Sequence, residues 1–492
     1  MFRAFHTALR ISPKTIGLSV RSGLVLFGSR AALVEPANRN SLGNPVDIQF
    51  TRPITKNGSW VDSWQLALTN WQASLLTLLR ALNLLRICFP LIILSPIAYY
   101  REGYRYTWFR RLVRTLEQCG PIFIKLGQWA ATRRDLFPLS LCQELSVLHR
   151  STQTHTWLET KDILESNLEQ ELTKVFHHIE EFPFGSGSCA QVHKAKLKSN
   201  DTMVAVKVLH PNIRHLFQQD LKVMQAIAKS VLWMAPNLKW LSPDESLREF
   251  AKLMDCQLNL KIEAQNLELL SRNFKSTSNV IFPKPVHHLC SEYVLVETFE
   301  EGIHIGDFIK DVVNEQDRPL MKKVANIGVH MLLKMIFQDN LVHGDLHPGN
   351  ILVRNEDPPR IVILDPGIVS SLSTHDMGNF KSVFKAVISG DGSRVGHLFL
   401  ERSFNQCQSP EKFVKEMESI VLEARSQQLS LNRLDVSKLL TKVFNTLLVH
   451  EVKLESNFAS VILAILVLEG LGRTLDPDLD LVIKATPYVM RS

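Results

Sequence analysis

The chain lacks the marks of several common protein classes. Its seven cysteines are scattered over 492 residues without a Cys-x-x-Cys pair, which argues against a disulfide framework or a redox motif and favours reduced thiols. Its 17 histidines show no spacing typical of metal ligands. No array of basic and aromatic residues is present, so nothing supports binding of nucleic acid. Internal repeats and long low-complexity tracts are also absent, which leaves a globular protein with extensions.

Acidic residues are missing from the first 34 positions, where the basic residues are Arg3, Arg10, Lys14, Arg21 and Arg30. Serine and small apolar residues fill the gaps. This composition is typical of an amphipathic mitochondrial transit peptide and differs from a secretory signal with its compact apolar core. A disordered basic tail has the same composition and stays open as the alternative. Without these five charges the formal net charge falls from +7 to about +2, so the basic character lies largely in this segment.

The next two segments are a predicted linker, residues 35–74, and a strongly apolar stretch, residues 75–100, interrupted by Arg80 and Arg86. The uninterrupted part, residues 87–100, has 14 residues, fewer than the ~20 that span a bilayer. Snorkelling of the two arginines would extend it, and the arginines that follow suit anionic lipid. We predict a membrane-anchoring segment, either a single span or an interfacial helix, with a buried helical hairpin as the alternative.

The strongest chemical signal is the sequence Leu341-Val-His-Gly-Asp-Leu-His-Pro-Gly-Asn-Ile-Leu352, followed by Ile363-Leu-Asp-Pro-Gly367. Asp345 stands five residues before Asn350, and Asp365 ends an apolar stretch. This is the layout of a kinase catalytic loop and magnesium loop. Asp345 would act beside the attacking hydroxyl, while Asn350 and Asp365 would supply oxygen ligands to Mg²⁺. A polar hairpin between two strands is the alternative, because both loops contain good turn formers.

A glycine-rich loop and a lysine strand precede this signal. The loop, Gly185-Ser-Gly-Ser-Cys-Ala-Gln-Val192, matches the phosphate-covering loop of kinases with alanine in the third glycine place. The residues expected to bind ATP there are Gly185, Ser186, Gly187, Ser188, Ala190 and Val192. The strand Val204-Ala-Val-Lys-Val-Leu209 presents Lys207, which would hold the α- and β-phosphates. Either motif alone is more often a hairpin turn or a solvated lysine, but all four parts come in the order that a kinase needs.

Three segments carry a resemblance to a known family. They are Lys125-Leu-Gly-Gln128, Glu263-Ala-Gln-Asn266 and His343-Gly-Asp-Leu-His-Pro-Gly-Asn350. Together they resemble the Lys-x-Gly-Gln signature and the catalytic motifs of the UbiB-type atypical kinases, also called aarF-domain-containing kinases. The resemblance covers roughly residues 104–490.

The resemblance implies an α+β, bilobal protein-kinase-like fold with an N-terminal helical extension that carries the Lys-x-Gly-Gln motif. We expect the extension at residues 104–182, the small lobe at 183–302 and the large lobe at 303–492. The resemblance also implies that Lys125 and Gln128 lie near the nucleotide. It selects Glu263 as the partner of Lys207, which the several carboxylates of the helical stretch 247–270 do not decide by themselves.

The resemblance implies an ATP-dependent kinase or ATPase, with Mg²⁺, in mitochondrial lipid or ubiquinone (coenzyme Q) metabolism. The expected partners are ATP, a lipid or quinone-like small molecule, a mitochondrial membrane and coenzyme Q biosynthetic proteins. The expected location is the inner membrane with the kinase-like domain on the matrix side. A mitochondrial protein kinase and a nucleotide-binding pseudokinase scaffold are the alternative functions.

The chain departs from the family pattern at three places. Gly185-Ser-Gly-Ser188 replaces an alanine-rich loop and is nearer to ordinary kinases. Asp365-Pro-Gly367 replaces Asp-Phe-Gly, and a proline fixes its own φ and cannot pack like phenylalanine. Neutral or basic residues also stand where the family usually has acidic ones, at His149-Arg150, Gln257 and Asn259. The grip of the extension on the active site is therefore expected to differ.

Overall fold

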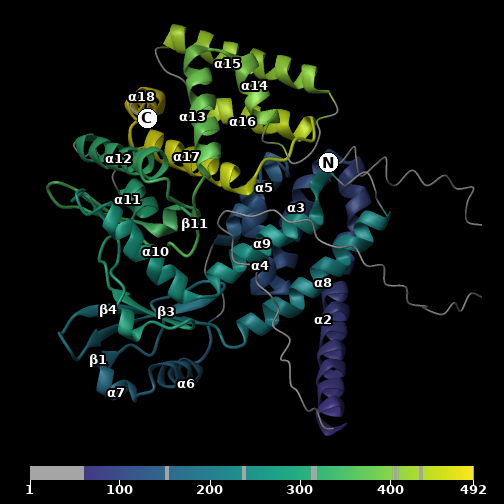
Figure 1. The fold of residues 1–492 in the computed structure, drawn as a ribbon, viewed down its shortest axis with the longest axis vertical. Helices are drawn as coiled ribbons and strands as arrows, with labels where there is room; N and C mark the ends of the chain where they lie inside the picture. Colours follow the sequence, from purple (N-terminus) through teal and green to yellow (C-terminus); the bar gives the residue numbers. More distant parts are fainter. Residues whose placement is uncertain are drawn as a thin grey trace, which may run out of the picture.

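The structure is a computed structural model that describes residues 60–490 apart from 150–153, 235–239, 312–317, 402, 404–406, 408 and 432–435. The predicted transit peptide and the first part of the predicted linker lie outside the described residues. Within the described part, a helical extension, a small lobe built on a sheet and a large helical lobe follow one another along the chain (Figure 1). This is the predicted α+β, bilobal kinase-like fold.

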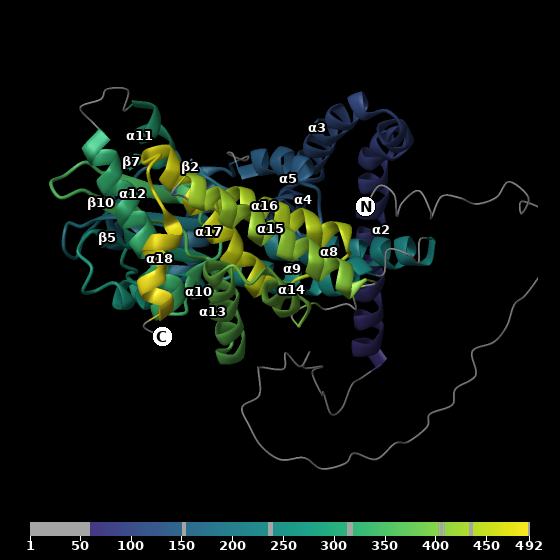
Figure 2. The same cartoon turned by 90° about the horizontal axis from the view of Figure 1, so that it is seen from above.

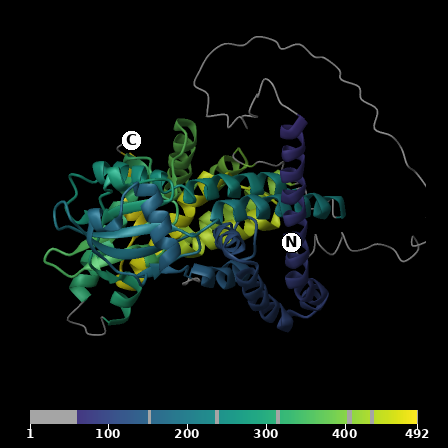
Figure 3. The same cartoon turned by 90° about the horizontal axis from the view of Figure 1, so that it is seen from below.

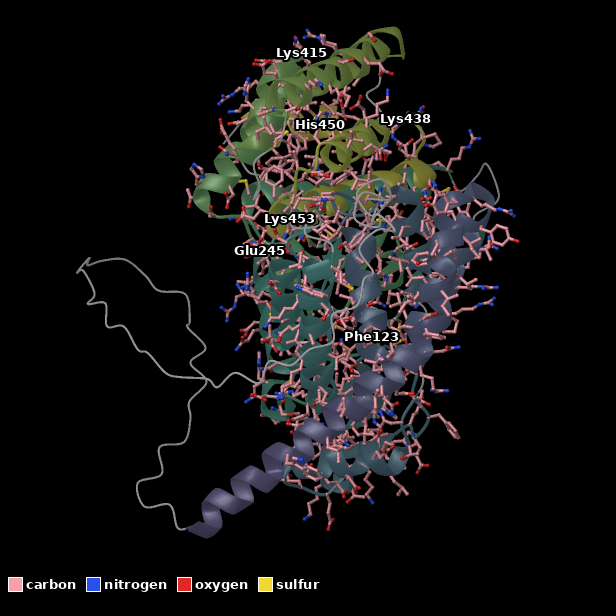
Figure 4. The ribbon with its side chains drawn as sticks, turned by 90° about the vertical axis from the view of Figure 1, so that its right-hand side faces the viewer. Phe123, Glu245, Lys415, Lys438, His450 and Lys453 are labelled. Atoms are coloured by element: carbon pink, nitrogen blue, oxygen red, sulfur yellow. The ribbon has the colours of Figure 1, made fainter. Side chains whose placement is uncertain are left out.

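The extension begins with one long helix, α2 (Trp60–Tyr100), which continues through Pro90 and Pro96. Residues 60–74, predicted as part of the linker, are therefore helical, and no hairpin forms inside the apolar segment. One face of α2 packs with Leu84 and Ala98 against the folded domain. Its N-terminal half projects from the body of the molecule (Figures 1 and 4).

The rest of the extension is a set of shorter helices. They are α3 (Glu102–Cys119), α4 (Pro121–Thr132), α5 (Leu139–Leu145) and the 3₁₀ turn Ser146–His149. Gly120 joins α3 to α4 with φ of +104°, a conformation that favours glycine, and Pro121 then starts α4 at a position where its missing N–H costs nothing. This turn directs α4, which carries Lys125, toward the centre of the molecule.

The small lobe is an antiparallel sheet in the order β1-β3-β4-β6, with β2 paired to β3. Its strands are β1 (Phe176–Ile179), β2 (Gly185–Ser186), β3 (Ala190–Leu197), β4 (Met203–Leu209) and β6 (Val294–Thr298). The helices α6 (Trp157–Leu168) and α7 (Leu172–Val175) cover one face. Val204, Val206 and Val208 pack into that face, so the alternate residues of β4, including Lys207, point to the other side. The sheet and α2 lie at opposite sides of the molecule (Figure 3).

Three helices come between β4 and the remaining small-lobe strand. They are α8 (Ile213–Met234), α9 (Pro243–Gln257) and α10 (Leu260–Asn273). The predicted continuous stretch 247–270 is thus two helices, because the chain breaks at Leu258 and Asn259 caps α10 by accepting a hydrogen bond from the Lys261 N–H. The break gives α10 its own direction, and Glu263 lies in its first turn.

The large lobe starts with α11 (Ile305–Asp311) and α12 (Arg318–Leu333), which runs into a π-helical turn, Lys334–Gln338. The apolar face of α12 and the turn after it belongs to the core, since Val324, Met331, Leu332 and Met335 are buried. Short strands carry the loops of interest: β5 (Val280–Ile281), β7 (Ile303–His304), β8 (Val342–His343), β9 (Ile351–Arg354), β10 (Arg360–Ile363) and β11 (Val369–Ser370).

Helices form the rest of the large lobe: α13 (Thr374–Ser389), α14 (Gly392–Leu400), α15 (Pro410–Leu431), α16 (Val436–Val449), α17 (Ser456–Leu475) and α18 (Leu481–Met490). Figure 2 shows them lying across the molecule. In the described part, two segments are long and apolar enough to cross a membrane, Ser74–Ala98 in α2 and Ser456–Leu475. The second is α17, which is largely buried and forms part of the core.

Candidate functional site

A cleft of about 650 Å³ separates the small-lobe sheet from the large lobe. We call it the interlobe cleft. The predicted residues that line it are Lys125, Gly185, Ser186, Gly187, Ser188, Ala190, Val192, Lys207, Glu263, Asn350 and Asp365. The structure therefore brings together the glycine-rich loop, the lysine strand and the two predicted magnesium ligands, although they are spread over more than a third of the chain.

Lys207 is the shared partner in a cluster of ionic contacts in the interlobe cleft. Its Nζ donates to Oε1 and Oε2 of Glu263 at 2.7 and 2.9 Å and to Oδ1 of Asp365 at 2.7 Å. The structure thus places Glu263 at the position that the resemblance implied. The glutamate side chain is 4% exposed, whereas the Asp365 side chain is 44% exposed and faces the cleft. One lysine therefore joins the small lobe, helix α10 and the loop Asp365-Pro-Gly367, the predicted magnesium loop, which we call the metal loop.

The charges in this cluster shift one another's pKa values. Burial acts to lower the pKa of Lys207, but Asp365 and Glu263 outweigh it and raise that pKa above its ordinary value. Loss of solvent opposes ionisation of Asp365, yet the charge of Lys207 lowers its pKa to about 2. Burial raises the pKa of Glu263 to about 7 despite the lysine. Asp365 is consequently ionised at neutral pH, and Glu263 can exchange a proton there.

The catalytic loop is held by a buried histidine. The His343 Nε2 bonds the carbonyl oxygen of Leu364 at 3.0 Å, and its Nδ1 accepts from the backbone N–H of Asp345 at 3.2 Å. Because a carbonyl oxygen only accepts, Nε2 carries the proton and the ring is neutral. Asn350 Nδ2 donates to the Asp345 carbonyl at 3.0 Å. The loop with Asp345 and the loop with Asp365 are in this way fixed to each other.

The metal loop has an unusual backbone conformation and a second contact, a hydrogen bond to helix α10. Asp365 has a φ of +55°, a region that aspartate tolerates better than most residues. The Pro366 carbonyl accepts a hydrogen bond of 2.8 Å from the buried Asn266 side chain on α10. Helix α10 therefore contributes both the carboxylate that holds Lys207 and the amide that holds the loop. Pro366, which cannot pack like phenylalanine, is fixed through its backbone instead.

A chain of polar side chains supports the glycine-rich loop from behind. The Gly187 carbonyl accepts from His210 Nε2 at 2.9 Å, so His210 Nδ1 must accept from His155 Nδ1 at 2.8 Å. His155 Nε2 then accepts from the Thr160 hydroxyl at 2.9 Å. Burial lowers the pKa of His155 to about 4, which agrees with this neutral arrangement. The loop is thus anchored to helix α6.

A second cavity of about 400 Å³ lies beside the catalytic loop, between α4, α9 and the start of α17. We call it the second cavity. It is lined by Asp345 and Gln128, and it shares Lys125 and Gln257 with the interlobe cleft. Gln128, which the resemblance places near the nucleotide, lines this second cavity and not the interlobe cleft. Its Nε2 donates to the Leu148 carbonyl at 2.8 Å, so its amide holds the turn after α5 outside the interlobe cleft.

One wall of the second cavity contains an ion cluster that motif reasoning missed. Arg133, directly after α4, donates to both oxygens of Asp135 at 2.9 and 2.7 Å and to Glu249 Oε2 on α9 at 2.9 Å. It also donates to the Leu454 carbonyl and the Ser456 hydroxyl at 3.1 and 2.7 Å. The cluster locks the extension to α9 and to the start of α17. Nearby, Figure 4 shows Lys453 beside Glu245, an ion pair of 3.4 Å.

The residues that sequence reasoning missed had weak signals. His343 and Asn266 belonged to recognised motifs but had no role assigned. Arg133 and Asp135 follow the Lys-x-Gly-Gln motif within a few residues, and two adjacent arginines in an otherwise apolar segment could have pointed to a buried ion pair. Glu297, at the end of the apolar sequence Val294-Leu-Val-Glu297, also lines the interlobe cleft. A single glutamate after three apolar residues is no motif, so the sequence gives it no chemical role.

Fold and cleft together define a protein of the kinase-like class. The family model described as the ABC1 atypical kinase-like domain matches residues 147–399, and the UbiB helical domain matches residues 424–480. The chain belongs to the ABC1/UbiB family of atypical kinases. The C-terminal helices of the large lobe therefore include a helical domain with a family model of its own.

Several curated relatives show the same similarity. A mitochondrial ABC1 family protein of Saccharomyces cerevisiae is 32% identical over 487 residues, covering 84% of this chain and 74% of the relative. A mitochondrial ABC1 family protein of Schizosaccharomyces pombe is 32% identical, covering 84% and 70%. A protein of Tolumonas auensis named "Probable protein kinase UbiB" is 33% identical over 384 residues, covering 77% and 69%. The two fungal relatives are labelled mitochondrial.

Proposed function

We propose that the protein is an ATP-dependent atypical kinase or ATPase. The observation that carries the proposal is the Lys207–Glu263–Asp365 cluster, formed at 2.7–2.9 Å at the wall of an open cleft that also holds the glycine-rich loop. Kinases need a lysine held by a helix carboxylate, so that its charge is placed at the nucleotide phosphates, and an aspartate for the metal. The ordered loops around Asp345 and Asp365 support the same proposal.

The donor set of the cleft fits Mg²⁺. Asp365 is ionised because Lys207 lowers its pKa to about 2. Asn350 uses its amide nitrogen on the Asp345 carbonyl, which leaves the amide oxygen as the ligand atom. Both are oxygen donors, as this hard cation prefers. When bound, Mg²⁺ neutralises charge on the phosphates.

The residues of the chain have distinct tasks in this proposal. Lys207 holds phosphate oxygens, and Glu263 keeps the lysine in place. The glycine-rich loop, anchored through His210, covers the phosphates with its backbone N–H groups. Asp345 accepts the proton of the attacking hydroxyl, or of water in an ATPase. His343 orients Asp345 through the backbone N–H of that residue.

The second cavity supports a small acceptor rather than a protein. Asp345 lines this cavity and not the interlobe cleft. Helices α4 and α9 form its outer walls, which restricts access of a folded protein to Asp345. Helix α13 begins at Thr374, directly after β11, so the segment after Asp365 leaves little chain for a peptide-binding surface. We therefore favour a lipid or quinone-like molecule that carries a hydroxyl.

Helix α2 supports attachment to a membrane. Large apolar side chains with more than half of their surface exposed lie along it, among them Leu78, Leu82, Phe89 and Ile93. Such a stripe is unusual in water and suits the acyl chains of a lipid layer. Together with the basic N-terminal segment and the fungal relatives, it supports the mitochondrial inner membrane with the kinase-like domain on the matrix side. The family resemblance supports a role in lipid or coenzyme Q metabolism, with coenzyme Q biosynthetic proteins as partners.

The test is Mg²⁺-dependent ATP turnover by the full chain, in liposomes with and without cardiolipin. We expect turnover that cardiolipin raises and that Asp345→Asn lowers by about 10²-fold or more, because a general base is lost. Asp307→Asn is the matched control, since this exposed aspartate on α11 forms a surface ion pair with Lys310 and lines neither cavity. It should keep the activity of the unchanged protein.

Other outcomes would favour the alternative functions. Efficient phosphorylation of a peptide library would contradict the small acceptor and favour a protein kinase. Nucleotide binding without turnover in any lipid would contradict the catalytic proposal and favour a nucleotide-binding scaffold. In that case Pro366 would be the first residue to examine.

A further inference from the structure

Glu297 is a buried carboxyl group at the end of the interlobe cleft away from the glycine-rich loop. The residue is 9% exposed, lines the cleft, and its Oε2 has no hydrogen-bond partner among the described residues. Burial, followed by the charge of Glu263, raises its pKa to about 8. A buried polar group without a partner is costly and rare in a folded protein. The proposed catalytic steps do not use it.

The register of the sheet places this carboxyl group. Glu297 on β6 is the direct partner of Ala205 on β4, and Leu295 is the partner of Lys207. Residues that are opposite in register point to the same side, and side chains alternate along a strand. Glu297 therefore faces the cleft on the same side as Lys207, two residues further along the strand and next to the connection between the lobes.

The neighbouring polar side chains of this connection are engaged. The Thr298 hydroxyl donates to Glu300 Oε1 at 2.6 Å, and Glu300 Oε2 accepts from Arg354 Nη2 at 2.5 Å. Arg354 also donates to the Glu301 carbonyl at 2.8 Å. These bonds hold the connection on the large lobe and leave Glu297 as a group with unused hydrogen-bonding capacity at this end.

We propose that Glu297 reads the base of the nucleotide and selects adenine over purines with a 6-oxo group. This inference rests on the proposed nucleotide site: with the phosphates at Lys207 and the glycine-rich loop, the base lies at the Glu297 end. One edge of adenine presents a donor, the 6-amino group, next to an acceptor, N7. A protonated carboxyl group offers the matching acceptor and donor, as a glutamine amide does.

A 6-oxo purine presents two acceptors on the same edge. The protonated carboxyl group has one donor, so one pairing is lost and two oxygens with lone pairs face each other. Ionisation of Glu297 would remove the donor and make the mismatch worse. Selectivity for the 6-amino group therefore holds in either protonation state, although contact with N7 requires the proton.

The test is equilibrium binding of ATP, inosine triphosphate and 7-deaza-ATP to the full chain in detergent with Mg²⁺. We expect ATP to bind about 10-fold or more tightly than inosine triphosphate, the size that a matched two-bond contact gives. Removing N7 should weaken binding several-fold near pH 7. These two comparisons need no variant, so they remain informative if a substitution prevents folding.

Two substitutions identify the residue responsible. Glu297→Gln keeps one donor and one acceptor and should keep the preference for ATP. Glu297→Leu removes both and should bring the two affinities within about 2-fold, with thermal unfolding as a check of the fold. Glu181→Gln, at an exposed position outside the cleft, is the matched control.

Three results would overturn the inference. The first is equal affinity of the unchanged protein for ATP and inosine triphosphate. The second is a preference that survives Glu297→Leu, which would show that the carboxyl group serves Lys207 or the fold instead. The third is the absence of binding by either nucleotide, and this result alone would also overturn the proposed function.

Discussion

The Arg133 cluster and the Lys207 cluster each join one cation to two carboxylates, and they are built differently. Arg133 is 3% exposed with Asp135 at 0%, and its hydrogen bonds also reach Leu454 and Ser456. Lys207 is 15% exposed, and its partner Asp365 is 44% exposed at the edge of an open cleft. The first cluster is almost fully buried in the wall of the second cavity, whereas the second cluster opens into the interlobe cleft through Asp365.

The difference agrees with a structural task for the Arg133 cluster and with the chemical task proposed for the Lys207 cluster. The guanidinium of Arg133 has a rigid fork of donors that fits three distant segments at once, so the cluster locks α4 to α9 and α17. The ammonium of Lys207 is a compact charge on a flexible stem, beside a glutamate whose pKa is about 7. That cluster also borders the open interlobe cleft, where a ligand can reach Lys207 and Asp365. The following experiments would break or sharpen this distinction.

Arg133→Met should have the largest effect, a loss of about 3–5 kcal/mol in the free energy of unfolding. The substitution leaves the side chain of Asp135 buried without its cation. Chemical denaturation of the full chain, followed by tryptophan fluorescence, measures the loss. Arg133→Lys should recover only part of it, because an ammonium cannot form the two-pronged contact. A variant as stable as the unchanged protein would show that the cluster does not hold these segments together.

Lys207→Met should have the reverse pattern of effects, a large loss of turnover with a small loss of stability. Turnover should fall by about 10²–10³-fold, the usual result of removing one positioned donor from a site of developing charge. The free energy of unfolding should change by less than about 1.5 kcal/mol, because Glu263 can take up a proton and Asp365 is open to solvent. The same denaturation experiment and an ATP turnover assay check both parts. A large loss of stability would remove the contrast with Arg133.

Glu297 provides a third situation, a buried carboxyl group without a cation. An unfolded glutamate is ionised above its ordinary pKa of about 4.3, but folded Glu297 keeps its proton up to about pH 8. The folded state then binds more protons, so stability should fall as pH rises through this range. Thermal unfolding should show that Glu297→Gln removes a decline on the order of 2 kcal/mol between pH 5.5 and 7.5. Parallel curves for the two proteins would contradict the assignment.

Asn266→Leu should have the smallest effect, about 1 kcal/mol in the free energy of unfolding. The substitution keeps the branching of the side chain but removes the 2.8 Å hydrogen bond to the Pro366 carbonyl. Because this bond orients the metal loop, the apparent affinity for Mg²⁺ in the turnover assay should weaken by a few-fold. An unchanged Mg²⁺ dependence would show that Lys207 alone positions Asp365.

The sequence predicted those parts of the site that lie within continuous motifs. The spacing of Asp345, Asn350 and Asp365 indicated a kinase loop because all three are held by short strands of one small region. Glu263 needed the family resemblance, since several carboxylates on the same helical stretch look alike without knowledge of which one faces Lys207. Motif membership does not give the direction of a side chain, and Gln128 lines the second cavity while Lys125 of the same motif lines both cavities.

Other features depend on contacts that no local pattern records. The Arg133 cluster combines residues near positions 133, 249 and 455, and only the packing of α4, α9 and α17 brings them together. Whether the Glu297 carboxyl group has a hydrogen-bond partner depends on all the groups that surround it in the folded protein. The sequence shows only a glutamate at the end of an apolar strand. The extent of α2 was also missed, because polar residues before position 75 resembled a linker.

One consequence follows from the contacts of Arg80. Its Nε and Nη2 hold Asp220 on α8 at 2.7 and 2.9 Å, and Nη2 also bonds the Cys119 carbonyl at 2.6 Å, just before α4 begins. Helix α2 therefore cannot tilt without moving the base of the helix that carries Lys125. In a bilayer, such a helix would transmit its tilt to the folded domain as a rigid lever, in addition to attaching the domain to the membrane. The thickness and curvature of the lipid layer would then set both the height of the interlobe cleft above it and the geometry of the second cavity.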